Sequence, residues 1–175
     1  MSGTNMKSKS IPNAKTPEQT KGAPGSSLII PPGVYRIYSF LSNYKIVDMA
    51  LSEDSRGRHN VKLYDDSDAP ESTWHIKYSG NGDHTISNGL YQARLVQPYD
   101  GNVVAAPSGG MGQEVYWIFK DAGSGGFFYI QNKRYGTVMD VKGGQTGNNT
   151  NIIDYAYGGT ENQRFRLWRI GDNPG

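Results

Sequence analysis

One pattern of residues occurs three times along this chain, and the repetition restricts the possible folds more than any other feature. Each copy has an Ile, a Tyr, a short strand-like segment beginning with Asn, and a closing aromatic residue. These are Ile37, Tyr44, Asn60–Tyr64 and Trp74, then Ile86, Tyr91, Asn102–Ala106 and Trp117, then Ile130, Tyr135, Asn151–Tyr155 and Phe165. The spacing of about 42–49 residues indicates a repeated supersecondary unit. Three copies are too few for most propellers or solenoids, so the pattern favours a closed, threefold object.

Each repeat contains four strand-like stretches separated by glycine-rich turns, with repeats at about 33–82, 83–126 and 127–170. Twelve short strands must close or split into two layers to hide their edges. Each closing aromatic is followed two positions later by an apolar residue, and this spacing places both on one face of a strand. These apolar residues are Ile76, Phe119 and Leu167. The sequence therefore predicts an all-β fold whose strands surround one shared core.

The first 28 residues differ in composition from the rest. They contain four lysines, one glutamate and almost no large apolar side chains. Such a segment buries too little surface to offset its ordering entropy, so we expect residues 1–28 to be a disordered tail before a single domain at 29–175. The other 147 residues carry a net charge of −1. A nearly neutral domain lacks the basic surface that nucleic-acid binding requires, and we expect no nucleic acid partner.

The chain has no cysteine, no apolar run long enough for a membrane helix and no apolar core of a secretory signal. We therefore expect a cytoplasmic protein without a membrane span, whose release would need a non-classical route. Disulfides are excluded.

The third repeat carries a family signature. Gln163-Arg164-Phe165 resembles the Gln-x-Trp/Phe motif that closes each repeat of ricin-B-type lectins. The segments Asn148–Tyr155 and Gly158–Phe165 are similar to the last half-repeat of that family, and Ser72-Thr73-Trp74 and Val115-Tyr116-Trp117 are weaker versions of the motif. The resemblance covers about residues 29–171 and is nearest to the cysteine-poor fungal and bacterial members. It implies a β-trefoil, which is a six-stranded barrel capped by three hairpins, and a carbohydrate-binding function.

By match to the family motif, the third repeat has a complete sugar site. Asp140 is the acidic residue, Tyr155 the aromatic platform, Asn162 the amide and Gln163 the residue that orients the aspartate, with the Gly143 backbone as a further donor. An aromatic ring stacks on the C–H face of a pyranose, and a carboxylate makes charge-assisted bonds to its hydroxyls. Ile153 replaces a polar residue found in many members. The resemblance implies galactose or N-acetylgalactosamine as the sugar.

The other two repeats keep less of this set. The first repeat has Asp48 and Tyr64 but Glu71 in place of the amide, so a second, altered carbohydrate site and an inert surface are both open. Two carboxylates placed together would repel each other or raise one pKa. The second repeat has Leu95 near the acidic position and Ala106 at the platform, which predicts no site.

No pattern of catalytic or metal-binding residues is present. His59, His75 and His84 lack the spacing of metal ligands, and Asp65-Asp66-Ser67-Asp68 lacks the glycine and distal glutamate of a calcium loop. We therefore expect neither an enzyme, a metal site nor a cofactor.

Two rival functions remain open beside glycan binding. Some fungal trefoils inhibit proteases through exposed loops, which here would be Tyr99-Asp100-Gly101 or Ala122–Gly126. Alternatively, the chain is the glycan-targeting component of a toxin assembly. A homodimer or another protein partner is compatible with any of these functions.

Overall fold

The computed structural model describes residues 25–108, 112–123 and 125–172. In these ranges the chain forms thirteen strands and short 3-10 turns, without α-helix, and no helix could cross a membrane. The strands are β1 (Ser27–Leu28), β2 (Gly33–Ser39), β3 (Lys45–Met49), β4 (His59–Asp65), β5 (Trp74–Gly80), β6 (Asp83–Asn88), β7 (Arg94–Tyr99), β8 (Asn102–Pro107), β9 (Trp117–Asp121), β10 (Phe127–Asn132), β11 (Val138–Val141), β12 (Ile152–Tyr155) and β13 (Phe165–Gly171). The turns are η3 (Pro70–Ser72), η4 (Gln113–Val115), η5 (Lys142–Gly144) and η6 (Glu161–Gln163).

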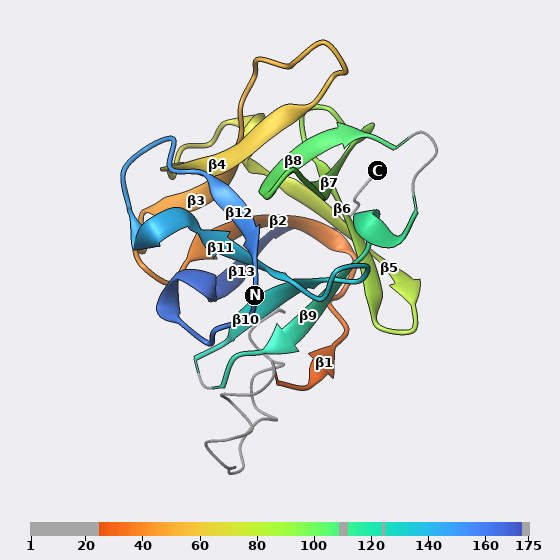
Figure 1. Ribbon diagram of the computed structural model, residues 1–175, viewed down its shortest axis with the longest axis vertical. Helices are drawn as coiled ribbons and strands as arrows, with labels where there is room; N and C mark the ends of the chain where they lie inside the picture. Colours follow the sequence, from red (N-terminus) through yellow and green to blue (C-terminus); the bar gives the residue numbers. More distant parts are fainter. Residues whose placement is uncertain (1–24, 109–111, 124, 173–175) are drawn as a thin grey trace.

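The first and last strands of each repeat form a closed barrel (Figure 1). They pair in the ring β2–β5–β6–β9–β10–β13, and β13 returns to β2 with Leu167 opposite Ile37. The hairpins β3–β4, β7–β8 and β11–β12 cap the barrel, and β8 pairs with both β4 and β12. A bridge between Lys62 and Asn151 joins the first and third hairpins. The predicted β-trefoil is confirmed.

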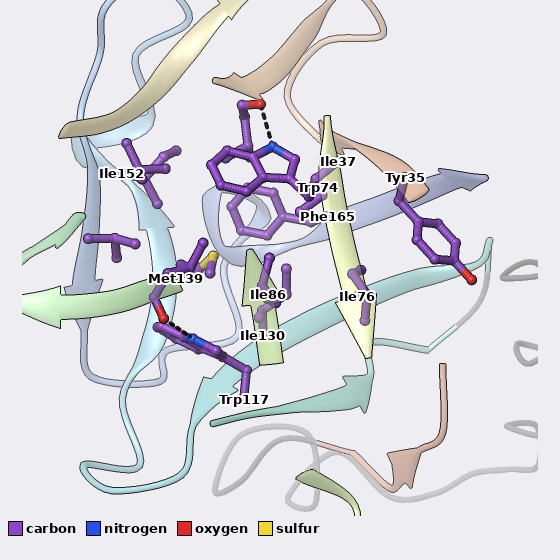
Figure 2. Close-up of a cluster of buried hydrophobic side chains, with 14 of the residues drawn as sticks. Tyr35, Ile37, Trp74, Ile76, Ile86, Trp117, Ile130, Met139, Ile152 and Phe165 are labelled. Carbon is purple, nitrogen blue, oxygen red and sulfur yellow. Dashed lines mark hydrogen bonds between the residues drawn. The ribbon is translucent and has the colours of Figure 1, made fainter. Parts of the chain in front are cut away.

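The closing aromatics of the three repeats meet in one core (Figure 2). Trp74, Trp117 and Phe165 are fully buried in a single cluster and each begins the last strand of its repeat. The indole N–H of Trp74 donates to the carbonyl of Val47, and that of Trp117 donates to the carbonyl of Val96, both at 2.9 Å. These bonds satisfy the polar atom of each buried indole and fix the cap hairpin over it.

The predicted boundary between tail and domain was wrong by a few residues. Ser27 and Leu28 form β1, which pairs with Lys120 and Phe119 of β9 and adds a thirteenth strand to the twelve expected. Downstream of β1, Ile30 is fully buried, and its backbone N–H donates to Nε2 of His84 at 3.0 Å. Backbone pairing with β9 therefore outweighs the polar composition of this segment. The rest of the predicted tail, residues 1–24, lies outside the described residues.

Candidate functional site

The hairpin β11–β12 sets the positions of the predicted site residues. Asp140 pairs with Ile153 and Val138 pairs with Tyr155 in an antiparallel register. Because side chains alternate along a strand, these four residues lie on one face of the hairpin, and Met139, Val141 and Ile152 lie on the opposite face and belong to the core. The face of Asp140 and Tyr155 is called the outer face here, although Val138 on it is fully buried. Asp140 and Tyr155 are thus fixed on one face by strand pairing.

Asp140 is the centre of a hydrogen-bonded cluster between β11 and η6. Asp140 is only 5% exposed, and each of its two carboxylate oxygens accepts a hydrogen bond of 2.9 Å, one from the amide of Asn162 and one from the amide of Gln163. Burial raises the pKa of Asp140, and the Gln163 bond opposes this rise. A carboxylate has about four acceptor positions, so two stay available for donors of a ligand.

The two amides also hold the surrounding backbone. Gln163 donates to the carbonyl of Ala156 at 3.0 Å and accepts from the N–H groups of Gly158 and Gly159 at 2.8 and 3.2 Å. Asn162 donates its second N–H to the carbonyl of Val141 at 3.0 Å. Both N–H bonds of Asn162 are therefore directed at protein oxygens. In this arrangement the amide fixes Asp140, and it has no free N–H to offer to a ligand.

Tyr155 and Gly143 lie at the solvent-facing side of this cluster. The Tyr155 residue is 58% exposed, so its ring is accessible to a ligand. Gly143 lies in η5 with φ of 63°, a left-handed conformation that favours glycine. Gly143 and Asn162 also line an open depression of about 470 Å³, together with Leu41, Gly144, Gly159, Thr160, Glu161 and Arg164. Tyr155 lies outside that lining.

The first repeat brings Asp48 and Tyr64 together but adds a cation between them. Lys62 pairs with Asp48 across β3–β4, the position that Ile153 has in the third repeat. Its ammonium lies 2.5 Å from Asp48 Oδ2 and 4.4 Å from the centroid of the Tyr64 ring, while Ser72 Oγ donates to the other carboxylate oxygen at 2.5 Å. The partners of Asp48 are thus Lys62 and Ser72, and Lys62 covers one face of Tyr64. The Glu71 carbonyl accepts a bond from Asn88 at 3.0 Å.

The second repeat has a register different from the predicted one. Leu95 pairs with Ala106, as Val138 pairs with Tyr155, so Ala106 does occupy the platform position. Gln97 pairs with Val104 and is the counterpart of Asp140, so the assignment of Leu95 near the acidic position was wrong by two residues. The indole bonds support this alignment, because Trp117 donates to Val96 as Trp74 donates to Val47, the residue before Asp48. Spacing along the chain did not reveal it because β7 and β8 are joined by a much shorter turn than the other two hairpins. The second repeat therefore has no carboxylate at the acidic position, which is Gln97, and no aromatic ring at the platform position, which is Ala106.

The remaining polar candidates have structural partners. The acidic run forms ion pairs, with Asp65 to Lys45 at 2.7 Å and Asp68 to Arg36 at 2.6 Å. Within the described ranges, no three His, Asp or Glu side chains are grouped closely enough to hold a metal ion. Two residues near the site were missed by sequence reasoning, namely Lys62 and Arg164. Lys62 could have been found from its spacing two residues before Tyr64, which puts both on one strand face.

The third repeat and the end of the second match a known protein family. Residues 114–174 match the family model described as a ricin-type beta-trefoil lectin domain-like family. The resemblance to ricin-B-type lectins is confirmed. The matched segment includes the five residues predicted for the third-repeat site, which are Asp140, Gly143, Tyr155, Asn162 and Gln163. No curated protein sequence matches the chain.

Solved structures agree with the trefoil fold. The designed threefold symmetric protein ThreeFoil is 24% identical, with a TM-score of 0.69, and the match covers 79% of this chain and 99% of that chain. The Rhizoctonia solani agglutinin is 20% identical, with a TM-score of 0.67 and coverage of 83% and 100%. A proteinase inhibitor from Coprinopsis cinerea is 16% identical, with a TM-score of 0.64 and coverage of 81% and 100%. At these identities the likeness shows the fold alone.

Proposed function

We propose that this chain is a lectin that binds glycans of the galactose or N-acetylgalactosamine type on the outer face of β11–β12. The observation that carries the proposal is Asp140, fixed by two amides and located on the same strand face as the exposed ring of Tyr155. The C–H face of a pyranose would stack on Tyr155, and its hydroxyls would donate to the open acceptor positions of Asp140. The family match over residues 114–174 supports carbohydrate binding at this repeat.

We propose one sugar site per chain. In the third repeat Ile153 carries no charge, so the side chain facing Asp140 neither pairs with the carboxylate nor brings a cation over Tyr155. In the first repeat Lys62 does both to Asp48 and Tyr64. The predicted second site at Asp48, Tyr64 and Glu71 is therefore less suited to a sugar. Binding requires no bond to be made or broken, so the proposed function is non-enzymatic.

A glycan array with the intact chain, followed by calorimetry, tests this function. We expect glycans that end in galactose or N-acetylgalactosamine to bind at a single site, because Lys62 occupies the equivalent position in the first repeat. Absence of binding to any glycan would contradict the proposal.

Protease inhibition is the second candidate function, and the structural likeness to the Coprinopsis inhibitor favours testing it. The loop at Tyr99–Gly101 is exposed, and the Arg58 guanidinium lies 3.8 Å from the centroid of the Tyr99 ring. In the other predicted loop, Ala122–Gly126, Ser124 lies outside the described residues. Inhibition of a protease panel by a chain that binds no glycan would favour this alternative. The toxin-assembly role, the homodimer and the cytoplasmic location stay predictions.

A further inference from the structure

The three junctions between successive repeats are built on equivalent buried residues, and one of the three differs. Asn88 pairs with Trp74 and Asn132 pairs with Trp117, each opposite the closing aromatic of the repeat before it. At the junction between the third and first repeats, Ser39 pairs with Phe165 in the same way. These three residues, Asn88, Asn132 and Ser39, are all buried.

The two asparagines tie neighbouring repeats together. Asn88 donates its amide N–H to the carbonyl of Glu71 in η3 at 3.0 Å, and Asn132 donates to the carbonyl of Glu114 in η4 at 2.9 Å. Their side-chain oxygens accept N–H groups of the following turn, from Leu90 at 2.9 Å and from Arg134 at 3.1 Å. Each asparagine therefore spans from the 3-10 turn of one repeat to the first turn of the next.

Ser39 makes only half of this connection. Its hydroxyl accepts the N–H of Leu41 at 3.0 Å, as the asparagine oxygens accept theirs. The residue equivalent to Glu71 and Glu114 is Asn162, which precedes Gln163 at the end of η6. A serine side chain lacks the amide arm that would reach the Asn162 carbonyl. Residues of both repeats line the depression of about 470 Å³ at this junction, with Leu41 from the first repeat and Thr160, Glu161 and Asn162 from the third. Ser39 is buried and does not line it.

The lining of this junction depression suits a neutral, hydroxyl-rich group. The Arg164 guanidinium donates to the Gly159 carbonyl at 3.1 Å and to the Tyr129 hydroxyl at 3.3 Å, which leaves further N–H donors out of its five. The Glu161 residue is exposed, and its carboxylate offers acceptors that offset the charge of Arg164. Leu41 supplies an apolar surface for C–H groups. The volume lies within the range of about 300–1,000 Å³ that is usual for small-molecule sites.

We infer that the junction depression is a second sugar subsite, so that the chain prefers disaccharides and longer neutral glycans to single sugars. The inference rests on the proposed function, because the depression shares Asn162 and Gly143 with the predicted site beside Asp140. The terminal sugar contacts Tyr155 and Asp140, and the next sugar enters the depression. The bridge that Asn88 and Asn132 make, and that Ser39 does not, is what distinguishes this junction from the other two.

Calorimetry with matched sugars tests the subsite. The probes are methyl β-galactoside and methyl N-acetylgalactosaminide against lactose, N-acetyllactosamine and the disaccharide galactosyl-β1,3-N-acetylgalactosamine. We expect the best disaccharide to bind about tenfold more tightly than the single sugar, a difference of about 1.4 kcal/mol. Ser39→Asn should add a bridge to the Asn162 carbonyl, and because Asn162 lines the depression we expect this bridge to narrow it. We expect this variant to lose the disaccharide preference and to keep its affinity for the methyl glycoside.

Two further variants make the result decisive. Asn88→Ser shortens the equivalent residue at the junction between the first and second repeats, which contributes nothing to the lining of the depression, and should leave the preference unchanged. Leu41→Ala removes the apolar surface of the depression and should lower disaccharide affinity. This variant tests the subsite if Ser39→Asn does not fold. Equal affinity of the wild type for single sugars and all three disaccharides would overturn the subsite while leaving the lectin function intact. An unchanged preference in folded Ser39→Asn and Leu41→Ala would do the same. Absence of binding to any probe would overturn both proposals.

Discussion

Removing the ring of Tyr155 should separate sugar binding from folding. The residue is 58% exposed and lies on the outer face of β12, away from the buried core, so Tyr155→Ala should change the free energy of unfolding by no more than about 0.5 kcal/mol. Ring stacking contributes about 0.5–1.5 kcal/mol beyond simple area burial. With the lost burial of the sugar face, we expect a total of about 1–2 kcal/mol, a decrease in affinity of roughly 5–30-fold.

The first repeat provides the matched control. Tyr64 pairs with Ile46 as Tyr155 pairs with Val138, but Lys62 covers one face of its ring. Tyr64→Ala should therefore leave sugar affinity unchanged. Calorimetry with methyl β-galactoside measures the affinities, and urea titration measures the stabilities. The reasoning is refuted if folded Tyr155→Ala binds like the wild type, or if Tyr64→Ala lowers affinity as much as Tyr155→Ala does.

Three further outcomes follow from the buried polar groups. Asp140→Ala leaves the amides of Asn162 and Gln163 without one acceptor each, so urea titration should show a loss of about 1–3 kcal/mol in the free energy of unfolding. Calorimetry should show a loss of sugar binding, and unchanged stability would contradict the role of Asp140 as the anchor of the two amides. Burial raises the pKa of Asp140 above its ordinary value of 3.8, and the protonated group loses its charge-assisted bonds to a ligand. Sugar affinity should therefore decline at a pH above 3.8 as the pH is lowered, and constant affinity down to pH 3.8 would argue against ligand contact with this carboxylate. Burial also lowers the pKa of His84 from its ordinary value of 6.5, so His84 takes up a proton more readily in the unfolded chain, and the free energy of unfolding should fall as pH drops below 6.5. His84→Gln should show a smaller pH dependence in urea titrations, and an equal dependence would assign the effect to other groups.

The fold was predictable because its signal is repeated and apolar. Trp74, Trp117 and Phe165 recur at similar spacing, and burying three such rings at once requires one closed core. The proximity of Asp140 and Gln163 followed from the family motif, and the 2.9 Å bond between them agrees with it. Both predictions depend on features that the local sequence specifies.

The features that were missed depend on contacts between distant segments. β1 is held by backbone bonds to β9, which leave no mark in a stretch of Gly and Ser. The register of the second repeat is identified by strand pairing and by the indole bond of Trp117 to Val96, and no acidic residue marks it in the sequence. The effect of Ser39 is visible only when it is seen opposite Phe165, more than a hundred residues away in the chain.

The pairing of β2 with β13 also affects how the chain reaches its native state. β13 contacts both β2 and β10, so the edges of those two strands stay open until β13 pairs with them. During synthesis the β13 segment emerges after all the other barrel strands, and the ring cannot be completed earlier. Contacts between such distant segments slow folding, and open strand edges promote association between partly folded chains. Refolding from denaturant should therefore give the highest yield at low protein concentration.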